Sequence, residues 1–211
     1  NGSMLSIKPT NGDGDFTFSR NGNASRVNSS GNIVTEGANL PRINYENGCG
    51  SWLLEDESTN ILTQSQTFSD WLILGGRTQI TINNAISPDG TQNGAKFERI
   101  LATGNSAIRF TGLTIGDEYT FSLYAKKGNF DNFSLDISDI NTTFTLTDNW
   151  VRYEITEIAT GDFADISILG GVVGSYFYIW GGQIENQSYA TSYIPTSGAS
   201  STRLRDLATG S

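Results

Sequence analysis

Aromatic and polar side chains that alternate along a few short segments are the residues of this chain best suited to chemistry. The candidates are Tyr124, Lys126, Asp136, Tyr176, Tyr178 and Trp180. Pyranose rings carry apolar C–H patches on which aromatic rings stack, and polar or charged side chains bind their hydroxyls. These residue types therefore predict a non-covalent sugar-binding surface, in which the rings stack on sugars while Lys126 and Asp136 orient hydroxyls.

The alternation of residue types predicts which candidates point outward. Tyr124 falls on the polar face of its segment and should point away from the core. The rings at positions 176, 178 and 180 lie opposite Phe177 and Ile179, and both sets are apolar. Alternation therefore leaves open whether these rings are exposed or pack in the core. Trp71 and Trp150, each at an expected strand start, are interpreted as structural lids.

The residue content argues against an enzyme. The chain has no histidine, so it has no Ser/His/Asp triad, Cys/His dyad or imidazole metal ligand. Cys49 is interpreted as a structural thiol, buried or at a turn. Two carboxylates would suffice for a glycosidase. The densest acidic cluster, Glu55–Glu57, is interpreted as a solvated turn, and Glu154 with Glu157 is a weaker candidate for a catalytic pair.

Charge and metal chemistry narrow the partners further. A formal net charge of -9 opposes contact with a phosphate backbone, so no nucleic acid is expected. The oxygen-rich run Asn11–Asp15 fails the pattern of an EF-hand loop, which has Gly where this chain has Phe16 and Glu where it has Gly22. We expect no cofactor, and no residue set identifies a metal site, although structural calcium stays open.

Membrane insertion and disulfide bonding are not expected. No run approaches the roughly 18 apolar residues of a membrane helix, and Cys49 is the only cysteine, so no intrachain disulfide can form. Asn1-Gly2-Ser3 before Met4 resembles an expression remnant, so a native signal or neighbouring domain could lie outside this sequence.

The elements that must position the candidates are short strands. Apolar and polar residues alternate with period two, and Gly, Asn, Asp and Pro mark the turns between them. Expected strands cover 78–86, 95–101, 107–113, 119–126, 133–137, 144–146, 151–155, 166–168 and 176–180. Nowhere does a helical period persist. Regular strands of this spacing predict an all-β sandwich or jelly roll.

The N-terminal part differs, with short β-like pieces among many Gly, Asn and Ser residues. These pieces cover 15–20, 33–36 and 41–45. We therefore expect an N-terminal strap or small β subdomain over residues 1–60, followed by a β-sandwich over residues 61–211.

Several motifs carry a family resemblance. The N-terminal ones are Asp15–Arg20, Ser25–Asn28, Pro41–Tyr45, Trp52–Glu55 and Thr59–Leu62. They look like a segment common in tail-fibre and spike proteins of bacteriophages and prophages. The later ones are Ala85–Gly90, Tyr119–Gly128, Asn149–Tyr153, Trp180–Glu185 and Ala190–Thr196. They resemble the jelly-roll carbohydrate-binding modules that accompany such segments.

This resemblance implies a concanavalin-like sandwich on a virion or outside the cell that engages a polysaccharide or cell-surface glycan, and it transfers no ligand contact. Three functions stay open: a receptor-binding virion domain, an accessory carbohydrate-binding module of a polysaccharide-degrading enzyme, and a purely structural capsid or fibre module. The first predicts multivalent display, in which a homo-oligomer within a virion or fibre would raise avidity.

Overall fold

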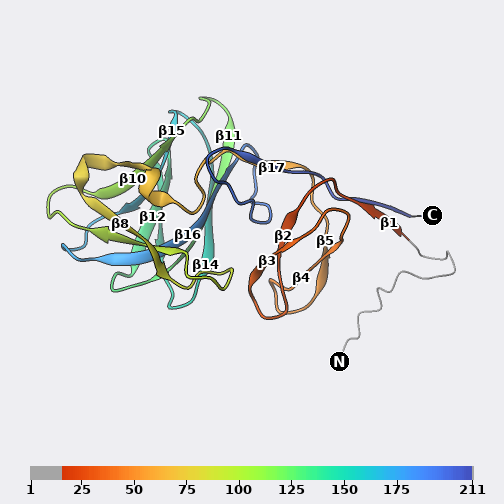
Figure 1. Cartoon of the computed structure of the whole chain (residues 1–211). Coiled ribbons are helices and arrows are strands. Elements are labelled where there is room, and N and C mark those ends of the chain that lie inside the picture. Colours follow the sequence, from red (N-terminus) through yellow and green to blue (C-terminus); the bar gives the residue numbers. More distant parts are fainter. Residues whose placement is uncertain (1–15, 211) are drawn as a thin grey trace. The chain divides into compact units, whose positions relative to one another are not determined.

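The computed structural model describes residues 16–210 and is built from β-strands (Figure 1). The helical content of this part is two short 3-10 turns, Phe68–Asp70 and Leu74–Gly76. In these described residues no helix is long and apolar enough to cross a membrane. The oxygen-rich run Asn11–Asp15 lies outside the described residues.

The chain folds into two compact units. The smaller one contains the described residues up to Ser58, Thr191–Ile194 and the segment from Thr202, and the larger one contains Thr59–Ala190 and Pro195–Ser201. The expected division near residue 60 placed all of residues 61–211 in the sandwich. The C-terminal segment groups with the smaller unit instead, because β1 (Phe16–Ser19) pairs antiparallel with β18 (Leu207–Gly210).

The larger unit is a sandwich of two five-stranded sheets, and all its ladders are antiparallel. The first sheet has the order β13-β12-β15-β10-β7, from β7 (Leu72–Ile73), β10 (Ser106–Thr111), β12 (Asn132–Ile137), β13 (Ile140–Thr145) and β15 (Phe163–Ile168). The second has the order β14-β11-β16-β9-β8, from β8 (Thr78–Ala85), β9 (Gly94–Arg99), β11 (Glu118–Lys127), β14 (Val151–Ile158) and β16 (Tyr176–Glu185). The chain crosses repeatedly between the sheets, which confirms the predicted jelly-roll type of sandwich.

The core lies between the two sheets and follows the predicted alternation. Phe121, Leu123 and Ala125 of β11 are fully buried. The ring of Phe177 lies 5.0 Å from that of Phe97 and 5.3 Å from that of Phe133, measured between centroids, so it joins the two sheets. Each such ring contributes about 2–3 kcal/mol by leaving water.

Trp71 belongs to this core, which confirms its structural interpretation. The residue is 7% exposed, and its ring stacks on that of Phe121 with centroids 6.3 Å apart. The indole nitrogen keeps a hydrogen bond after burial, because it donates to the carbonyl of Gln64 at 3.1 Å.

A β-bulge in β16 determines which of its side chains share a face. Three residues of β11, from Ser122 to Tyr124, oppose four of β16, from Gln183 to Trp180. Gly181 takes the extra position with φ of 64°, which glycine adopts without strain. Even-numbered residues before the bulge and odd-numbered residues after it therefore point outward.

The smaller unit is held by buried ion pairs. Its hairpins are β2 (Ala24–Val27) with β3 (Ile33–Glu36) and β4 (Arg42–Asn44) with β5 (Ser51–Leu53). The strands β6 (Ser58–Asn60) and β17 (Ser201–Arg203), which are not confined to this unit, form a separate two-stranded sheet. Arg20 donates to Asp206 at 2.8 Å and Arg42 donates to the other oxygen of the same carboxylate, and all three side chains are fully buried. Burial opposes ionisation of Asp206, but the two guanidinium groups outweigh it and lower its pKa.

Glu55 corrects the expectation of a solvated turn at Glu55–Glu57. Its carboxylate lies 2.8 Å from Arg42 and accepts hydrogen bonds from the amide and hydroxyl of Ser192 at 2.7 and 2.6 Å. The expectation is wrong for Glu55 because its partners come from distant parts of the sequence. Cys49 is exposed in the loop between β4 and β5. Of the two expected positions, at a turn or buried, the position at a turn is therefore correct.

Candidate functional site

The outer face of the second sheet gathers five of the six predicted candidates. Tyr124 and Lys126 come from β11, and Tyr176, Tyr178 and Trp180 come from β16. Phe177 and Ile179 are fully buried between the sheets, so the three rings of β16 point away from the core. The structure thus decides the alternative that the alternation left open.

Register places cations and a ring in one row across this face. Lys126 of β11 lies opposite Tyr178 of β16, and Tyr178 lies opposite Lys96 of β9. All three side chains are partly exposed. A ligand lying across the strands would meet a cation, a ring and a second cation in order.

Lys126 is held between two aromatic rings. Its Nζ lies 5.2 Å from the ring centroid of Tyr178 and 5.1 Å from that of Trp150, which precedes β14. An ammonium group at this range is attracted by the negative face of each ring. Trp150 is itself oriented, because its Nε1 donates to the carbonyl of Ile86 at 2.8 Å.

Lys96 makes a similar contact on the neighbouring strand. Its Nζ lies 5.2 Å from the ring centroid of Tyr176 and 2.6 Å from a carboxylate oxygen of Glu98. Tyr176 in turn meets Tyr178 edge to face, with centroids 5.6 Å apart. Burial, followed by the neighbouring Tyr176, raises the pKa of Tyr178, so its hydroxyl stays protonated and can donate to a ligand.

Tyr124 occupies the next row toward the bulge. Its ring lies below the guanidinium of Arg152, 5.5 Å from centroid to Cζ, and Arg152 also donates to the hydroxyl of Ser122 at 2.9 Å. Trp180 contacts the Tyr124 ring edge-on with centroids 5.6 Å apart. The prediction that Trp180 stacks on a sugar does not fit this arrangement, because its side chain is 1% exposed.

We name this surface the aromatic face and define it by the side chains that are partly exposed on it. They are Lys96, Tyr124, Lys126, Trp150, Arg152, Tyr176 and Tyr178. Sequence reasoning missed Lys96, Trp150 and Arg152. Lys96 alternates with the buried residues Ala95 and Phe97, which marked it as outward-facing. The strand order that brings β9 and β14 beside β16 and β11 had no such signal.

Asp136 lies on the opposite side of the sandwich, so its predicted place beside Lys126 is wrong. It belongs to β12 of the first sheet and alternates with the buried core residues Leu135 and Ile137. Alternation told correctly that Asp136 points outward, but it could not tell from which sheet.

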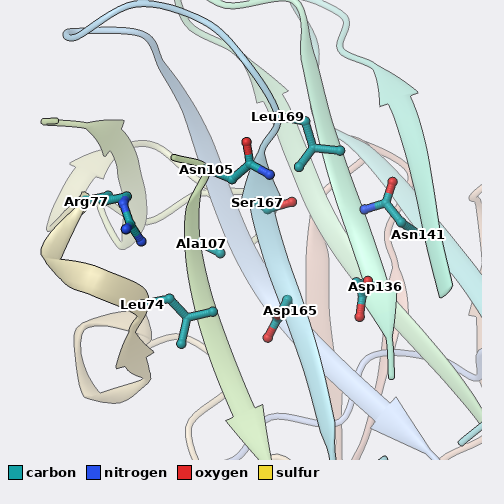
Figure 2. A pocket seen from close by; sticks show the side chains of 9 residues that line it. All are labelled: Leu74, Arg77, Asn105, Ala107, Asp136, Asn141, Asp165, Ser167 and Leu169. Atoms are coloured by element: carbon teal, nitrogen blue, oxygen red, sulfur yellow. The ribbon is translucent and has the colours of Figure 1, made fainter. Parts of the chain in front are cut away.

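Asp136 lines a shallow groove of about 280 Å³ on the outer face of the first sheet (Figure 2). The groove is lined by Leu74, Arg77, Asn105, Ala107, Asp136, Asn141, Asp165, Ser167 and Leu169. Register places Asp165 of β15 directly between Asp136 of β12 and Arg109 of β10. Arg109 binds both carboxylate oxygens of Asp165, each at 2.7 Å.

The two carboxylates of this groove therefore differ in their availability. Burial, with the nearby charges of Asp165 and Asp139, raises the pKa of Asp136 to about 6. Burial raises the pKa of Asp165 as well, although Arg109 opposes it. A glycosidase needs two carboxylates that both face the scissile bond. Arg109 occupies one of the pair, so the groove offers a single accessible acid.

Metal binding has no support in the described part of the chain, where no three Asp, Glu or Cys side chains gather as ligands. The aromatic face carries rings and cations. These groups can make non-covalent contacts: ring faces with apolar ligand patches, and ammonium, guanidinium and phenol groups with oxygen atoms.

Comparisons with known proteins found distant similarity in structure. No family model and no curated protein matches the chain. Among solved structures, the enzymatically active domain of tailspike protein 4 of bacteriophage CBA120 matches with a TM-score of 0.43 and 12% identity, over 59% of this chain and 21% of that one. The CBM22-1 and GH10 modules of Clostridium thermocellum xylanase 10B, complexed with xylohexaose, match with a TM-score of 0.43 and 16% identity, over 66% and 30%.

One of the similar structures is a single module that the match covers almost completely. The CBM22-1 xylan-binding domain of Paenibacillus barcinonensis Xyn10C matches with a TM-score of 0.41 and 13% identity, over 63% of this chain and 94% of that one. The present chain thus spans a minor part of the tailspike domain and of the xylanase fragment.

Proposed function

We propose that this protein is a non-catalytic carbohydrate-binding domain and that the aromatic face is its ligand site. The observation that carries the proposal is the row Lys126, Tyr178 and Lys96, which lies across three adjacent strands and stays partly exposed. Aromatic residues that only completed a core would be covered, as Phe177 is on the same strand.

Binding follows from the physical chemistry of these side chains. The apolar C–H face of a pyranose removes water from a tyrosine or tryptophan ring and gains about 25 cal/mol per Å² of apolar area. Hydroxyl oxygens accept from Lys and Arg, and the Tyr178 hydroxyl can donate or accept. Strands hold these groups, apart from Trp150, which directly precedes β14, so little ordering entropy is lost when a ligand binds.

A polysaccharide ligand implies that the domain works outside the cell or on a virion, where it would bind a host-surface or environmental glycan. Display of several copies, for example in a homo-oligomer within a fibre, would convert weak single sites into useful avidity. The alternative is an accessory module that holds a polysaccharide-degrading enzyme on its substrate. The domains encoded beside this one in the parent gene distinguish these two settings.

A glycan-array screen tests the proposal. The purified chain is tethered multivalently and exposed to marine, plant and bacterial-surface polysaccharides, so that weak sites register. A saturable signal that free oligosaccharide competes away is the expected result. Silence across the array from protein shown to be folded by circular dichroism would overturn the proposal and favour a structural fibre or capsid module.

A further inference from the structure

We infer that the ligand of the aromatic face is an acidic polysaccharide and that its anionic group, a carboxylate or a sulfate, pairs with Lys126. The inference rests on the proposed carbohydrate-binding function and names the class of its ligand.

Lys126 is a cation without an anion. Among residues 16–210 no carboxylate lies within 4.0 Å of its ammonium group, whereas Lys96 on the same face is paired with Glu98 and the adjacent Lys127 with Asp131. The rings of Trp150 and Tyr178 attract the ammonium and hold it over the sheet. They leave its positive charge uncompensated, and a bound anion would compensate it.

The charges around Lys126 favour an anion locally, against the trend of the chain. The outward positions near it on β9, β11 and β14 carry the cations Lys96, Lys126 and Arg152 and the carboxylates Glu98 and Glu154. The whole chain has a formal net charge of -9. The excess of cations over carboxylates at the aromatic face is therefore a local feature, and it favours an acidic over a neutral ligand.

The positions of these rings also favour a charged over a neutral sugar at this face. The ammonium of Lys126 lies within about 5 Å of two ring centroids, so one face of each ring already carries a cation. A neutral pyranose would have to stack beside a charge that it cannot neutralise. A uronate or sulfated residue would stack on a free ring surface and place its anion on the ammonium.

The test compares polysaccharides that differ only in charge. Polygalacturonate is paired with its fully methyl-esterified, uncharged form, and dextran sulfate is paired with dextran. Dissociation constants are measured by calorimetry at 50 and 500 mM NaCl for the wild type, Lys126→Met, Lys126→Arg and Lys127→Met. Lys126→Met keeps the aliphatic stem and removes the charge, and Lys127→Met is the matched control on the same strand.

We expect an acidic polymer to bind at least about tenfold more tightly than its neutral partner, and Lys126→Met to weaken that binding about tenfold. Lys127→Met should change it less than twofold, Lys126→Arg should retain most of it, and 500 mM salt should weaken it through screening. Binding confined to polygalacturonate assigns a carboxylate, and binding confined to dextran sulfate assigns a sulfate.

Two outcomes overturn the inference in different ways. The first outcome is equal binding of charged and neutral polymers, or an unchanged affinity in a Lys126→Met variant that unfolds at the same temperature as the wild type. This outcome contradicts the acidic ligand and leaves the carbohydrate-binding function standing. Binding to none of the four polymers, together with a silent glycan array, removes the function and the inference with it.

Discussion

The ammonium of Lys126 lies 5.2 Å from the ring centroid of Tyr178, its direct partner on the neighbouring strand of the same sheet. This pair combines the two kinds of contact that the proposed ligand needs, a ring and a cation, on a rigid element. It also separates two roles along β16, because Tyr178 points outward while its neighbour Phe177 is fully buried.

Truncation of the outward ring should reduce binding and leave the fold intact. Tyr178→Ala removes a partly exposed stacking surface, and we expect about a tenfold loss of glycan affinity, which corresponds to about 1.4 kcal/mol. The free energy of unfolding should change by less than about 1 kcal/mol, because the side chain faces solvent. Titration calorimetry and urea unfolding measure the two quantities.

The adjacent buried ring supplies the opposite control. Phe177→Ala should lower the free energy of unfolding by about 3–5 kcal/mol, because it opens a cavity between Phe97 and Phe133. A Tyr178→Ala variant as unstable as Phe177→Ala would place Tyr178 in the core and contradict its role in binding.

The smaller unit should depend on one carboxylate. Asp206→Asn leaves the buried guanidinium of Arg20 without a neutralising charge and leaves Arg42 with Glu55 alone, and we expect a loss of about 3 kcal/mol in the free energy of unfolding. Hydrogen exchange should accelerate in peptides that cover β1–β5. Asp131→Asn, which breaks an exposed pair with Lys127, should change stability by less than about 0.5 kcal/mol. Equal effects of the two variants would show that the buried pairs do not hold this unit.

Low pH should destabilise the smaller unit by protonating the carboxylates of Asp206 and Glu55. The pKa values of Asp206 and Glu55 are lowered in the folded protein, so both groups stabilise the fold above their unfolded pKa of about 4. That contribution is lost as the pH falls further through the lowered folded values. Wild-type exchange protection in β1–β5 should therefore decline below about pH 4 and should decline less in Asp206→Asn.

Asp136 should have the opposite pH dependence. Its pKa is raised to about 6 in the folded protein, above about 3.9 when unfolded, so the folded state binds more protons between these values. Its stabilising contribution is complete below about pH 4 and is lost as the pH rises through 6.

Relative to Asp136→Asn, the wild type should lose roughly 1 kcal/mol of unfolding free energy between pH 4 and 7, after allowance for solvent screening. Urea unfolding across this range measures the difference, with the exposed Asp162→Asn as control. Parallel curves for wild type and Asp136→Asn would contradict the raised pKa.

Local patterns in the sequence predicted the strands and their faces well. The segment from Tyr119 alternates as expected, with Phe121, Leu123 and Ala125 in the core and Tyr124 outside it. Partners distant in sequence could not be predicted in the same way. Glu55 was interpreted as solvated because Ser192, which donates to it twice, lies 137 residues away. The pairing of β1 with β18 is equally remote, and so the C-terminal segment was assigned to the sandwich.

In the candidate site, too, local patterns were predictable and contacts between distant strands were not. Alternation placed Tyr124 and Lys126 outside the core and left Tyr178 undecided, and the register across β11 and β16 brings the three together. Period-two patterns carry no information on strand order, so Asp136 was grouped with the wrong sheet. Trp150 was interpreted as a lid because its contact with Lys126 depends on β14 lying beside β11.

The most direct test of the account locates the ligand on the protein. Amide NMR spectra of the isotope-labelled chain are recorded during titration with an oligosaccharide that the array identifies. The account predicts shift changes that saturate together and cluster at Lys96, Tyr124–Lys126, Trp150–Arg152 and Tyr176–Tyr178. Changes clustered instead around Asp136 and Asp165 on the opposite sheet, or no saturable change, would contradict the assignment of the aromatic face as the binding site.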